Sequence, residues 1–216
     1  SEGETHWYLY YAGVNLLRFF NGEERIFVQR LKPGDPTQLD DSHGYDTPDI
    51  VLRPDQHWEF KAAWFAPKGI NEAPWVLKLS PGDEQYPVDS GKKAPIYYLM
   101  YSGAGANTPA YSVGYATSDS PLGPFVKYEK NPIILPDDPM SVGVIGPGHH
   151  SVWHEKSTGK MWAFYHQQRS TSTGWDRVLM VDELRFDKGL ISITVTREPG
   201  LVLGSETHKQ DAGQSK

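Results

Sequence analysis

The chain has 216 residues, which is long enough for one well-packed domain, and its 7 Trp, 12 Tyr, 21 Gly and 17 Pro favour many short strands over long helices. Its formal net charge of −6 argues against nucleic acid as a partner, because binding a phosphate backbone needs clustered Lys and Arg. No apolar run reaches the roughly 20 residues that span a bilayer, so we expect no membrane partner, and the absence of cysteine excludes disulfides and thiolate metal sites.

The beginning of the chain predicts strands around a long surface loop. Residues 6–13 are almost wholly apolar and aromatic, which predicts a buried central strand. Residues 24–31 predict a second strand, closed by the turn at 32–36. The polar stretch 37–54 is rich in Asp, Gly and Pro and predicts a surface loop, either an edge excursion or the rim of a binding site. Residues 58–64 alternate and predict an outer strand.

Short strands continue through the rest of the chain, at 76–79, 97–103, 111–118, 125–128, 151–154, 161–166, 177–184 and 190–195. Three of the predicted strands form a degenerate repeat, because each carries a tyrosine shortly before its end: Tyr11, Tyr101 and Tyr165. Four-stranded units repeated in this way are typical of propeller blades, and an ordinary β-sandwich is the alternative. We therefore expect an all-β fold with about three blades of four antiparallel strands.

Glu72 stands at the entrance to a predicted strand. It is followed by Ala73, Pro74 and Trp75, and then by the alternating residues 76–79. A carboxylate before a small residue and a proline is held at a chain bend, where it can act as a catalytic acid; the alternative is an ordinary surface glutamate. Trp75 can offer a stacking face for a sugar at the rim of a site, or it can pack between blades.

His149 stands at the entrance to another predicted strand, after the bend-forming residues 146–148. It can ligate a metal or hold a substrate hydroxyl, or it can be a loop histidine that bonds to the backbone. Glu72 and His149 take the same position in successive repeat units, so radial symmetry would bring both to one central opening. His150 and His154 lie close in sequence, but without a common face they do not predict a three-histidine metal site.

Several motifs occur together in one order along the chain: Glu72-Ala73-Pro74, YYLMYSG at 97–103, GYATSDSPLGPF at 114–125, GPGHHS at 146–151, Tyr165-His166, and residues 177–186 followed by Gly189-Leu190-Ile191. As a set they resemble glycoside hydrolase family 43. The resemblance is close over residues 70–200 and looser in the segments before them.

This resemblance implies a five-bladed β-propeller that hydrolyses arabinose- or xylose-containing plant polysaccharides, such as xylan and arabinan, with inversion at the anomeric carbon. It implies an enzyme of the α-L-arabinofuranosidase or β-xylosidase type in a secreted protein. Inverting hydrolysis needs one carboxylic acid that protonates the leaving oxygen and one carboxylate that activates water, about 6.5–9.5 Å apart.

The resemblance also implies roles for individual residues. Glu72 occupies the position of the family's general acid. His149 occupies the position of a histidine that lies beside a calcium or water-filled site on the propeller axis. Arg177 best fits an arginine that lies near the acid, with Arg169 as the second choice. The predicted catalytic residue is therefore Glu72, the predicted substrate-binding residues are Trp75, His149 and Arg177, and the predicted ligand of calcium is His149.

The chain departs from the family pattern at its beginning. The family's general-base Asp and a second Asp that tunes the acid precede a strand like 7–13, and this sequence starts after both. Asp46 and Asp49 come after that strand, so neither role transfers to them.

We expect one N-terminally incomplete propeller domain over residues 1–203 and a polar, disordered tail over 204–216. The missing base leaves a non-hydrolytic carbohydrate-binding protein, or one with different chemistry, as the alternative, and an open blade edge favours pairing with another copy.

Overall fold

The computed structural model describes residues 6–14, 22–40, 49–61, 68–87, 91, 93–137 and 143–196. The regular structure in these residues is almost entirely β-strand, with one turn of 3₁₀ helix, η2 (His57–Phe60). The strands are β1 (Trp7–Val14), β2 (Glu23–Lys32), β3 (Asp35–Leu39), β4 (Asp49–Leu52), β5 (Gly69–Leu79), β6 (Ile96–Gly103), β7 (Ser112–Ser118), β8 (Val126–Lys127), β9 (Gly148–Glu155), β10 (Lys160–Gln168), β11 (Arg177–Asp187) and β12 (Leu190–Ile193). Among the described residues, no helix is both long and apolar enough to cross a membrane.

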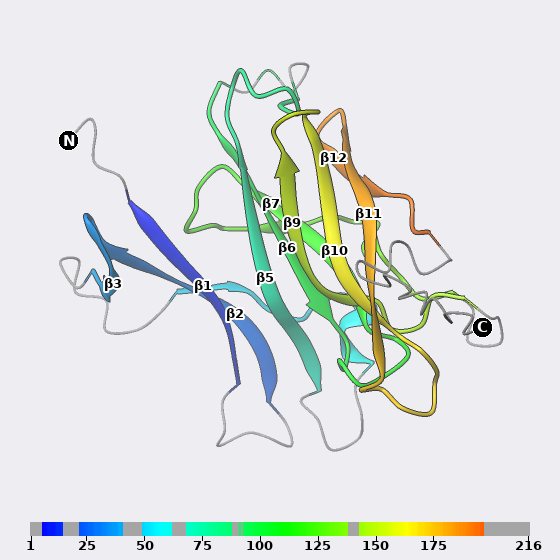
Figure 1. Ribbon diagram of the computed structural model, residues 1–216. Helices are drawn as coiled ribbons and strands as arrows, with labels where there is room; N and C mark the ends of the chain where they lie inside the picture. Colours follow the sequence, from blue (N-terminus) through cyan, green and yellow to red (C-terminus); the bar gives the residue numbers. More distant parts are fainter. Residues whose placement is uncertain are drawn as a thin grey trace, which may run out of the picture.

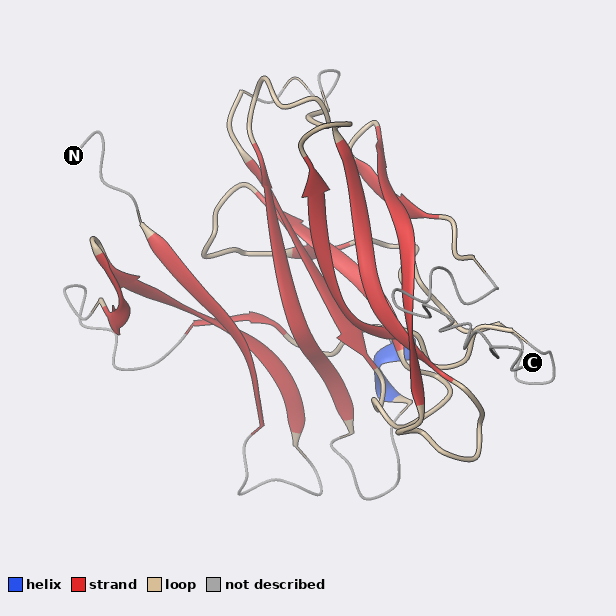
Figure 2. Cartoon of the chain, viewed as in Figure 1, coloured by secondary structure: helices blue, strands red, loops and turns tan. Residues whose placement is uncertain are grey.

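The strands form three groups that lie side by side (Figure 1), and described loops lie at both ends of the second and third groups (Figure 2). The second group, β5 to β8, and the third group, β9 to β12, are antiparallel meanders in chain order. In the first group, β1, β3 and β4 all pair with β2. β2 also meets β5 in parallel, where Glu23 pairs with Gly69 and Glu24 with Ile70. These groups confirm the predicted all-β fold of about three blades.

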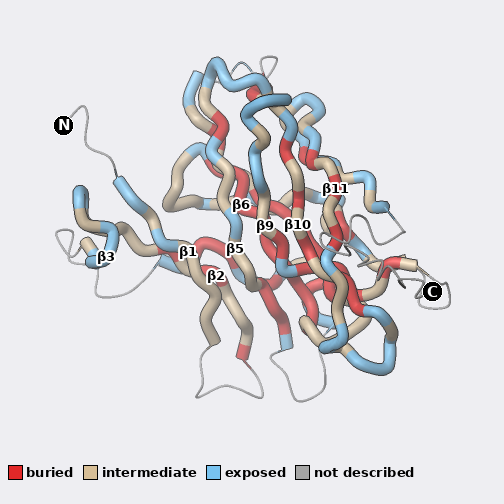
Figure 3. Tube along the Cα trace, in the orientation of Figure 1, coloured by how far each residue is buried: buried red, intermediate tan, exposed pale blue. Residues whose placement is uncertain are grey.

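The second group lies between two hydrophobic cores, one shared with the third group and the other with the first group and η2. Successive residues of β6 alternate between them: Tyr98 and Met100 belong to the first core, Leu99 and Tyr101 to the second. A strand buried on both faces needs apolar residues throughout, which explains why the β6 sequence does not alternate. Figure 3 shows the buried residues concentrated in these central strands.

The prediction of a buried central strand at 6–13 was wrong. β1 forms there, but it is the edge strand of its sheet, and Trp7 and Leu9 are 49% and 45% exposed. An apolar sequence shows that a strand can be buried, but it does not show whether another strand pairs with each of its edges. Within the described part of the chain, no strand pairs with the free edge of β1. Pairing of this edge with another copy stays a prediction.

The prediction of a loop over 37–54 was also wrong in part, because β3 and β4 lie at its two ends and residues 41–48 fall outside the described residues. A turn at Gly34, with φ of 77°, folds β3 back onto β2. The apolar residues of β4 pair with β2, where Ile26 lies opposite Leu52. The backbone of β2 thus supplies hydrogen-bond partners to a segment whose composition looked like a loop.

The outer strand predicted over 58–64 is absent from the described part of this segment, which forms η2, while residues 62–67 lie outside the description. The Glu59 carboxylate causes this difference. It accepts hydrogen bonds from the backbone N–H groups of Asp55 and Gln56, at 2.7 and 2.8 Å, and so closes a helical turn. The predicted tail over 204–216 also lies outside the described residues.

Candidate active site

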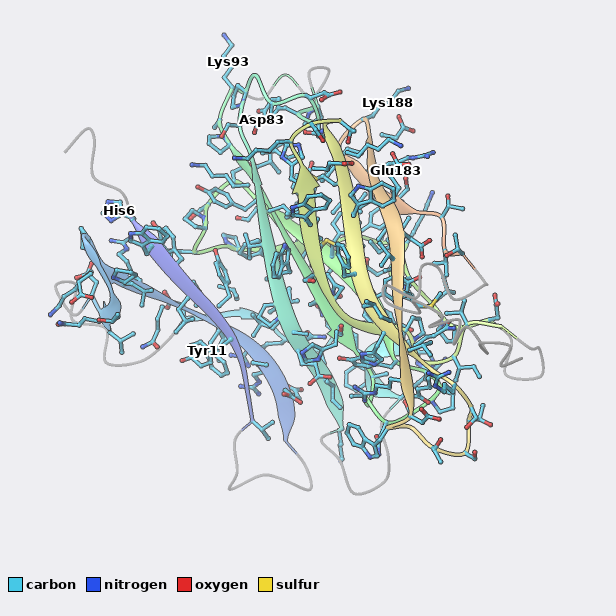
Figure 4. The ribbon with its side chains drawn as sticks, viewed as in Figure 1. His6, Tyr11, Asp83, Lys93, Glu183 and Lys188 are labelled. Atoms are coloured by element: carbon cyan, nitrogen blue, oxygen red, sulfur yellow. The ribbon has the colours of Figure 1, made fainter. Side chains whose placement is uncertain are left out.

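The predicted site residues gather at one end of the second and third strand groups. Glu72 lies near the start of β5, His149 near the start of β9, and Arg177 begins β11. In an antiparallel meander the start of one strand lies beside the end of the next, so this end also receives Ser102 from β6 and His166 from β10. The labelled charged residues Asp83, Lys93 and Lys188 lie at the opposite end (Figure 4).

A β-bulge directly follows Glu72. Glu72 pairs with Ser102 and Trp75 with Met100, so β5 contains one more residue than β6 between these pairs. Ala73, inside the bulge, has φ of 50°, a left-handed conformation that a residue with a Cβ adopts at a cost. Bulges redirect the neighbouring side chain, and a carboxylate beside a strained bulge is typical of a functional site.

β9 contains an equivalent bulge. Gly148 pairs with His166 and Ser151 with Phe164, again with one extra residue on the first strand, and His149 has φ of 53°. By this register His149 corresponds to Ala73, and the counterpart of Glu72 is Gly148. The predicted equivalence of Glu72 and His149 was therefore wrong by one residue, because the sequence repeat does not reveal where each bulge begins.

The bulges confirm the tyrosine repeat at two of its three positions, since Tyr101 and Tyr165 each lie opposite a bulge, between the flanking pairs. Each is buried and donates its hydroxyl proton to a carboxylate, Tyr101 to Glu59 at 2.7 Å and Tyr165 to Asp182 at 2.5 Å. The repeated tyrosine thus anchors the strand opposite each bulge.

Tyr111, directly before β7, contacts the predicted acid. Its hydroxyl donates to Oε1 of Glu72 at 2.6 Å, and its ring stacks on that of His166, with centroids 5.6 Å apart and an interplanar angle of 14°. A Cβ at Gly148 would lie 2.1 Å from Cε1 of Tyr111, so only glycine leaves room for this ring. Burial, and then the charge of Glu72, raise the pKa of Tyr111 well above its ordinary value of 10, which keeps the hydroxyl a donor.

His149 is exposed and joined to the Glu72 pair through its backbone. Its N–H donates to Oγ of Ser102, the residue opposite Glu72, at 2.9 Å. Its ring centroid lies 6.4 Å from that of His166. Burial, and then the Arg177 guanidinium and His149, lower the pKa of His166 to about 4, so His166 is neutral at pH 7.

The described residues include no cluster of metal-ligating side chains around His149. No three His, Asp or Glu side chains among them could hold a metal ion together, whereas calcium takes about six to eight oxygen ligands. His150 is buried with both ring nitrogens unpaired, and burial lowers its pKa to about 3, so it is a neutral interior residue. Calcium at the axis therefore stays a prediction of the resemblance, and we assign no chemical step to it.

Arg177 lies close enough to Tyr111 and His166 for its positive charge to act on the pKa of both side chains. It donates to the carbonyls of Ala106 and Gly174, at 2.9 and 3.1 Å, and its guanidinium lies 4.7 Å from the ring centroid of Trp175. The second choice, Arg169, instead forms a surface ion pair with Asp176 at 3.1 Å. The charge of Arg177 on Tyr111 and His166 associates Arg177, and not Arg169, with the residues around Glu72.

Two exposed tryptophans flank this group. Trp75 is 37% exposed on β5, directly after the bulge, and Trp175 is 72% exposed beside Arg177. Exposed indole rings can stack on sugar faces. Trp75 was predicted from the sequence and Trp175 was not, although a tryptophan in the polar stretch 169–176 is an unusual residue for a loop.

Glu24 brings a second carboxyl group near Glu72. Glu24 lies on β2, where it pairs with Ile70 of β5. Ile70 precedes Glu72 by two residues in β5. Burial, and then the charge of Glu72, raise the pKa of Glu24 to about 7. Glu24 could not be predicted from the sequence because the short parallel contact between β2 and β5 joins residues almost fifty positions apart. Tyr111 could not be predicted because a tyrosine at the start of an apolar strand is indistinguishable from a core residue.

A buried ion pair supports β5 behind the site. Glu59 is fully buried and accepts from Nζ of Lys127 at 2.6 Å. The same ammonium donates to Asp55 at 2.7 Å and to Oδ1 of Asn71, the neighbour of Glu72, at 3.2 Å. Because both charges are fully hydrogen-bonded, the pair fixes the first residues of β5 without leaving a buried charge unpaired.

Comparison with known proteins places these features in one family. The sequence model described as "Glycosyl hydrolases family 43" matches residues 1–191. The chain is similar to "Beta-D-galactofuranosidase xynD" of Aspergillus niger, with 30% identity over 135 residues, which are 61% of this chain and 34% of that protein.

Two solved structures share the fold. One is a thermostable family-43 glycoside hydrolase, with a TM-score of 0.67 and 30% sequence identity; the match covers 89% of this chain and 55% of that enzyme's chain. The other is an endo-1,4-beta-xylanase from Bacteroides thetaiotaomicron, with a TM-score of 0.65 and 26% sequence identity; the match covers 88% of this chain and 54% of that enzyme's chain. The chain thus spans about half the length of these structures. The family model covers most of the chain, and the protein belongs to glycoside hydrolase family 43.

Proposed function

We propose that this chain carries the general acid, Glu72, of an inverting glycoside hydrolase that cleaves xylose- or arabinose-containing plant polysaccharides. The observation that carries the proposal is the hydrogen bond of 2.6 Å between Tyr111 and Glu72, at a strained bulge where His149 and Arg177 also converge. A carboxyl group anchored by one oxygen has its other oxygen available to donate a proton to a leaving group. Since such polysaccharides are extracellular, we also propose that the protein is secreted.

The comparisons support the substrate class. One similar structure is named as a xylanase and the curated relative as a galactofuranosidase, and both are hydrolases of glycosidic bonds. They do not favour the alternative of a non-hydrolytic binding protein. The resemblance provides no counterpart within residues 1–216 for the carboxylate that activates water.

We further propose substrate contacts for the residues around Glu72. Arg177 carries a guanidinium whose charge acts on Tyr111 and His166. His149 is exposed, and its backbone bonds to Ser102, the residue opposite Glu72. Trp75 and Trp175 offer stacking faces for sugar rings. Such contacts would hold the glycosidic oxygen near Glu72, and orientation of this kind supplies a large part of enzymatic rate enhancement.

The test is hydrolysis of aryl xylosides and aryl arabinofuranosides by the chain and by Glu72→Gln. Loss of a general acid is expected to lower the rate on the order of 10²–10⁴-fold for phenyl leaving groups, and much less for 2,4-dinitrophenyl, which leaves without protonation. Proton NMR of the first-formed sugar should show inversion of the anomeric centre. Hydrolysis no faster than that of Glu72→Gln on the phenyl substrates would overturn the proposal.

A further inference from the structure

We propose that Tyr111 is a positioning residue for Glu72: its hydroxyl holds Oε1, so that the transferable proton resides on Oε2. The inference rests on the proposed role of Glu72 as the general acid. It adds a residue that the sequence motifs did not select and gives it a role in proton transfer.

The geometry fixes which atom donates and which accepts. Tyr111 is fully buried, and its oxygen lies 2.6 Å from Oε1 of Glu72. Because its raised pKa keeps the hydroxyl protonated, it donates to Glu72 whether Glu72 is neutral or charged. With Oε1 committed as an acceptor, Oε2 is the oxygen that can face a leaving group.

The same hydrogen bond changes strength during the reaction. While Glu72 is a neutral acid, the bond joins two neutral groups. As the proton leaves Oε2, the acceptor becomes a carboxylate, and hydrogen bonds to charged acceptors are roughly twice as strong. An interaction that strengthens towards the transition state lowers the barrier, whereas one of constant strength only aids binding.

The surroundings of Tyr111 keep its hydroxyl in place. His166 stacks on one face of the ring, and Gly148 leaves no side chain in the space that the ring edge fills. The charged and titratable groups near this pair are Glu24 from β2, His149 from β9, His166 from β10 and Arg177 from β11. Glu24 opposes negative charge on Glu72, and the Tyr111 hydroxyl favours it, so the two act in opposite directions.

The first experiment is a ¹³C NMR titration of the glutamate side-chain carboxyls in the full chain and in Tyr111→Phe. The Glu72 resonance is assigned by its absence in Glu72→Gln. Removal of one donor to the carboxylate is expected to move the Glu72 titration midpoint upward by about one pH unit. The matched control is Tyr98→Phe, which removes another buried hydroxyl, bonded to the carbonyl of Gly189 at 2.9 Å. That carbonyl follows Lys188 at the opposite end of the sheets (Figure 4).

The second experiment compares leaving groups. We expect Tyr111→Phe to lower kcat about tenfold to a hundredfold on phenyl glycosides and only a few-fold on 2,4-dinitrophenyl glycosides, with the alkaline limb of the pH–rate profile at higher pH. A merely structural tyrosine would affect both substrates equally. Equal losses, or a midpoint that matches the Tyr98→Phe control, would overturn the role of Tyr111. Absence of Glu72-dependent hydrolysis in the unsubstituted chain would overturn the proposed function instead, so the two failures are distinguishable.

Discussion

Gly148 takes the place in the β9–β10 pair that Glu72 takes in the β5–β6 pair, and the missing side chain of Gly148 is what lets Tyr111 reach Glu72. Each residue directly precedes the left-handed residue of its bulge, Ala73 in β5 and His149 in β9. One repeat unit therefore presents a carboxylate, and the next leaves a gap that the ring of Tyr111 fills. Neighbouring repeats thus supply complementary halves of one contact.

Replacing Gly148 should disrupt this contact. In Gly148→Ala the new Cβ would lie 2.1 Å from the Tyr111 ring, so the ring must move. We expect a loss of about 1–3 kcal/mol in the free energy of unfolding, as for other overpacked sites, measured by urea denaturation. Gly34→Asn is the control, because Gly34 is left-handed but has no atom within 4 Å of its ideal Cβ. Equal stability of Gly148→Ala and the unsubstituted chain would show that the ring has room.

The bulge after Glu72 should tolerate glycine and reject a β-branched residue. Ala73 has φ of 50°, where valine is strongly disfavoured. Ala73→Val is expected to lower the free energy of unfolding by about 1–3 kcal/mol and to reduce Glu72-dependent activity, whereas Ala73→Gly should retain the bulge. Thermal unfolding and hydrolysis rates of both variants check this. Full activity in Ala73→Val would contradict a role for the bulge in orienting Glu72.

The buried ion pair behind β5 should be required for stability. Lys127→Met leaves the fully buried carboxylate of Glu59 without its cation, 2.6 Å away in the unsubstituted chain. Removing one partner of such a pair typically costs about 3–5 kcal/mol, to be measured by urea denaturation. Arg185→Met removes an exposed cation from its ion pair with Glu183 and should cause no measurable loss. Similar urea denaturation midpoints for Lys127→Met and Arg185→Met would show that the buried ion pair is not required for stability.

Glu24 should make the protein less stable as pH rises towards neutrality. Burial and the charge of Glu72 raise its pKa from 4.5 to about 7, so between these values the unfolded chain has released a proton that the folded chain still binds. The free energy of unfolding therefore falls across about pH 4.5 to 7, and Glu24→Gln should remove this decline. Denaturation across this range measures the slope. Glu23→Gln is the matched control, because Glu23 instead pairs with Arg25 at 3.0 Å, and it should retain the decline.

Much of the fold could be predicted from local sequence. β6 and β10 lie close to their predicted positions because apolar periodicity and turn residues act over a few residues. β5 and β9 instead begin at Gly69 and Gly148, before the predicted strands at 76–79 and 151–154, because each continues through a bulge. The segment over 58–64 was mispredicted because one carboxylate, Glu59, satisfies two backbone N–H groups and pairs with Lys127, which lies far along the chain. Alternation along the sequence carries no information about such a partner.

The sequence by itself determined most of the strand-forming segments, the repeat, and Glu72 and His149 as candidates, since residue type and spacing suffice for these, while Arg177 became a candidate through the family resemblance. Only the tertiary structure decided that Tyr111 contacts Glu72, that Gly148 makes the contact possible, and that Glu24 lies nearby. These relationships depend on the position of each bulge and on contacts between strands of different groups. Both are set by packing between segments distant in sequence, so the residues next to each position in the sequence do not indicate them.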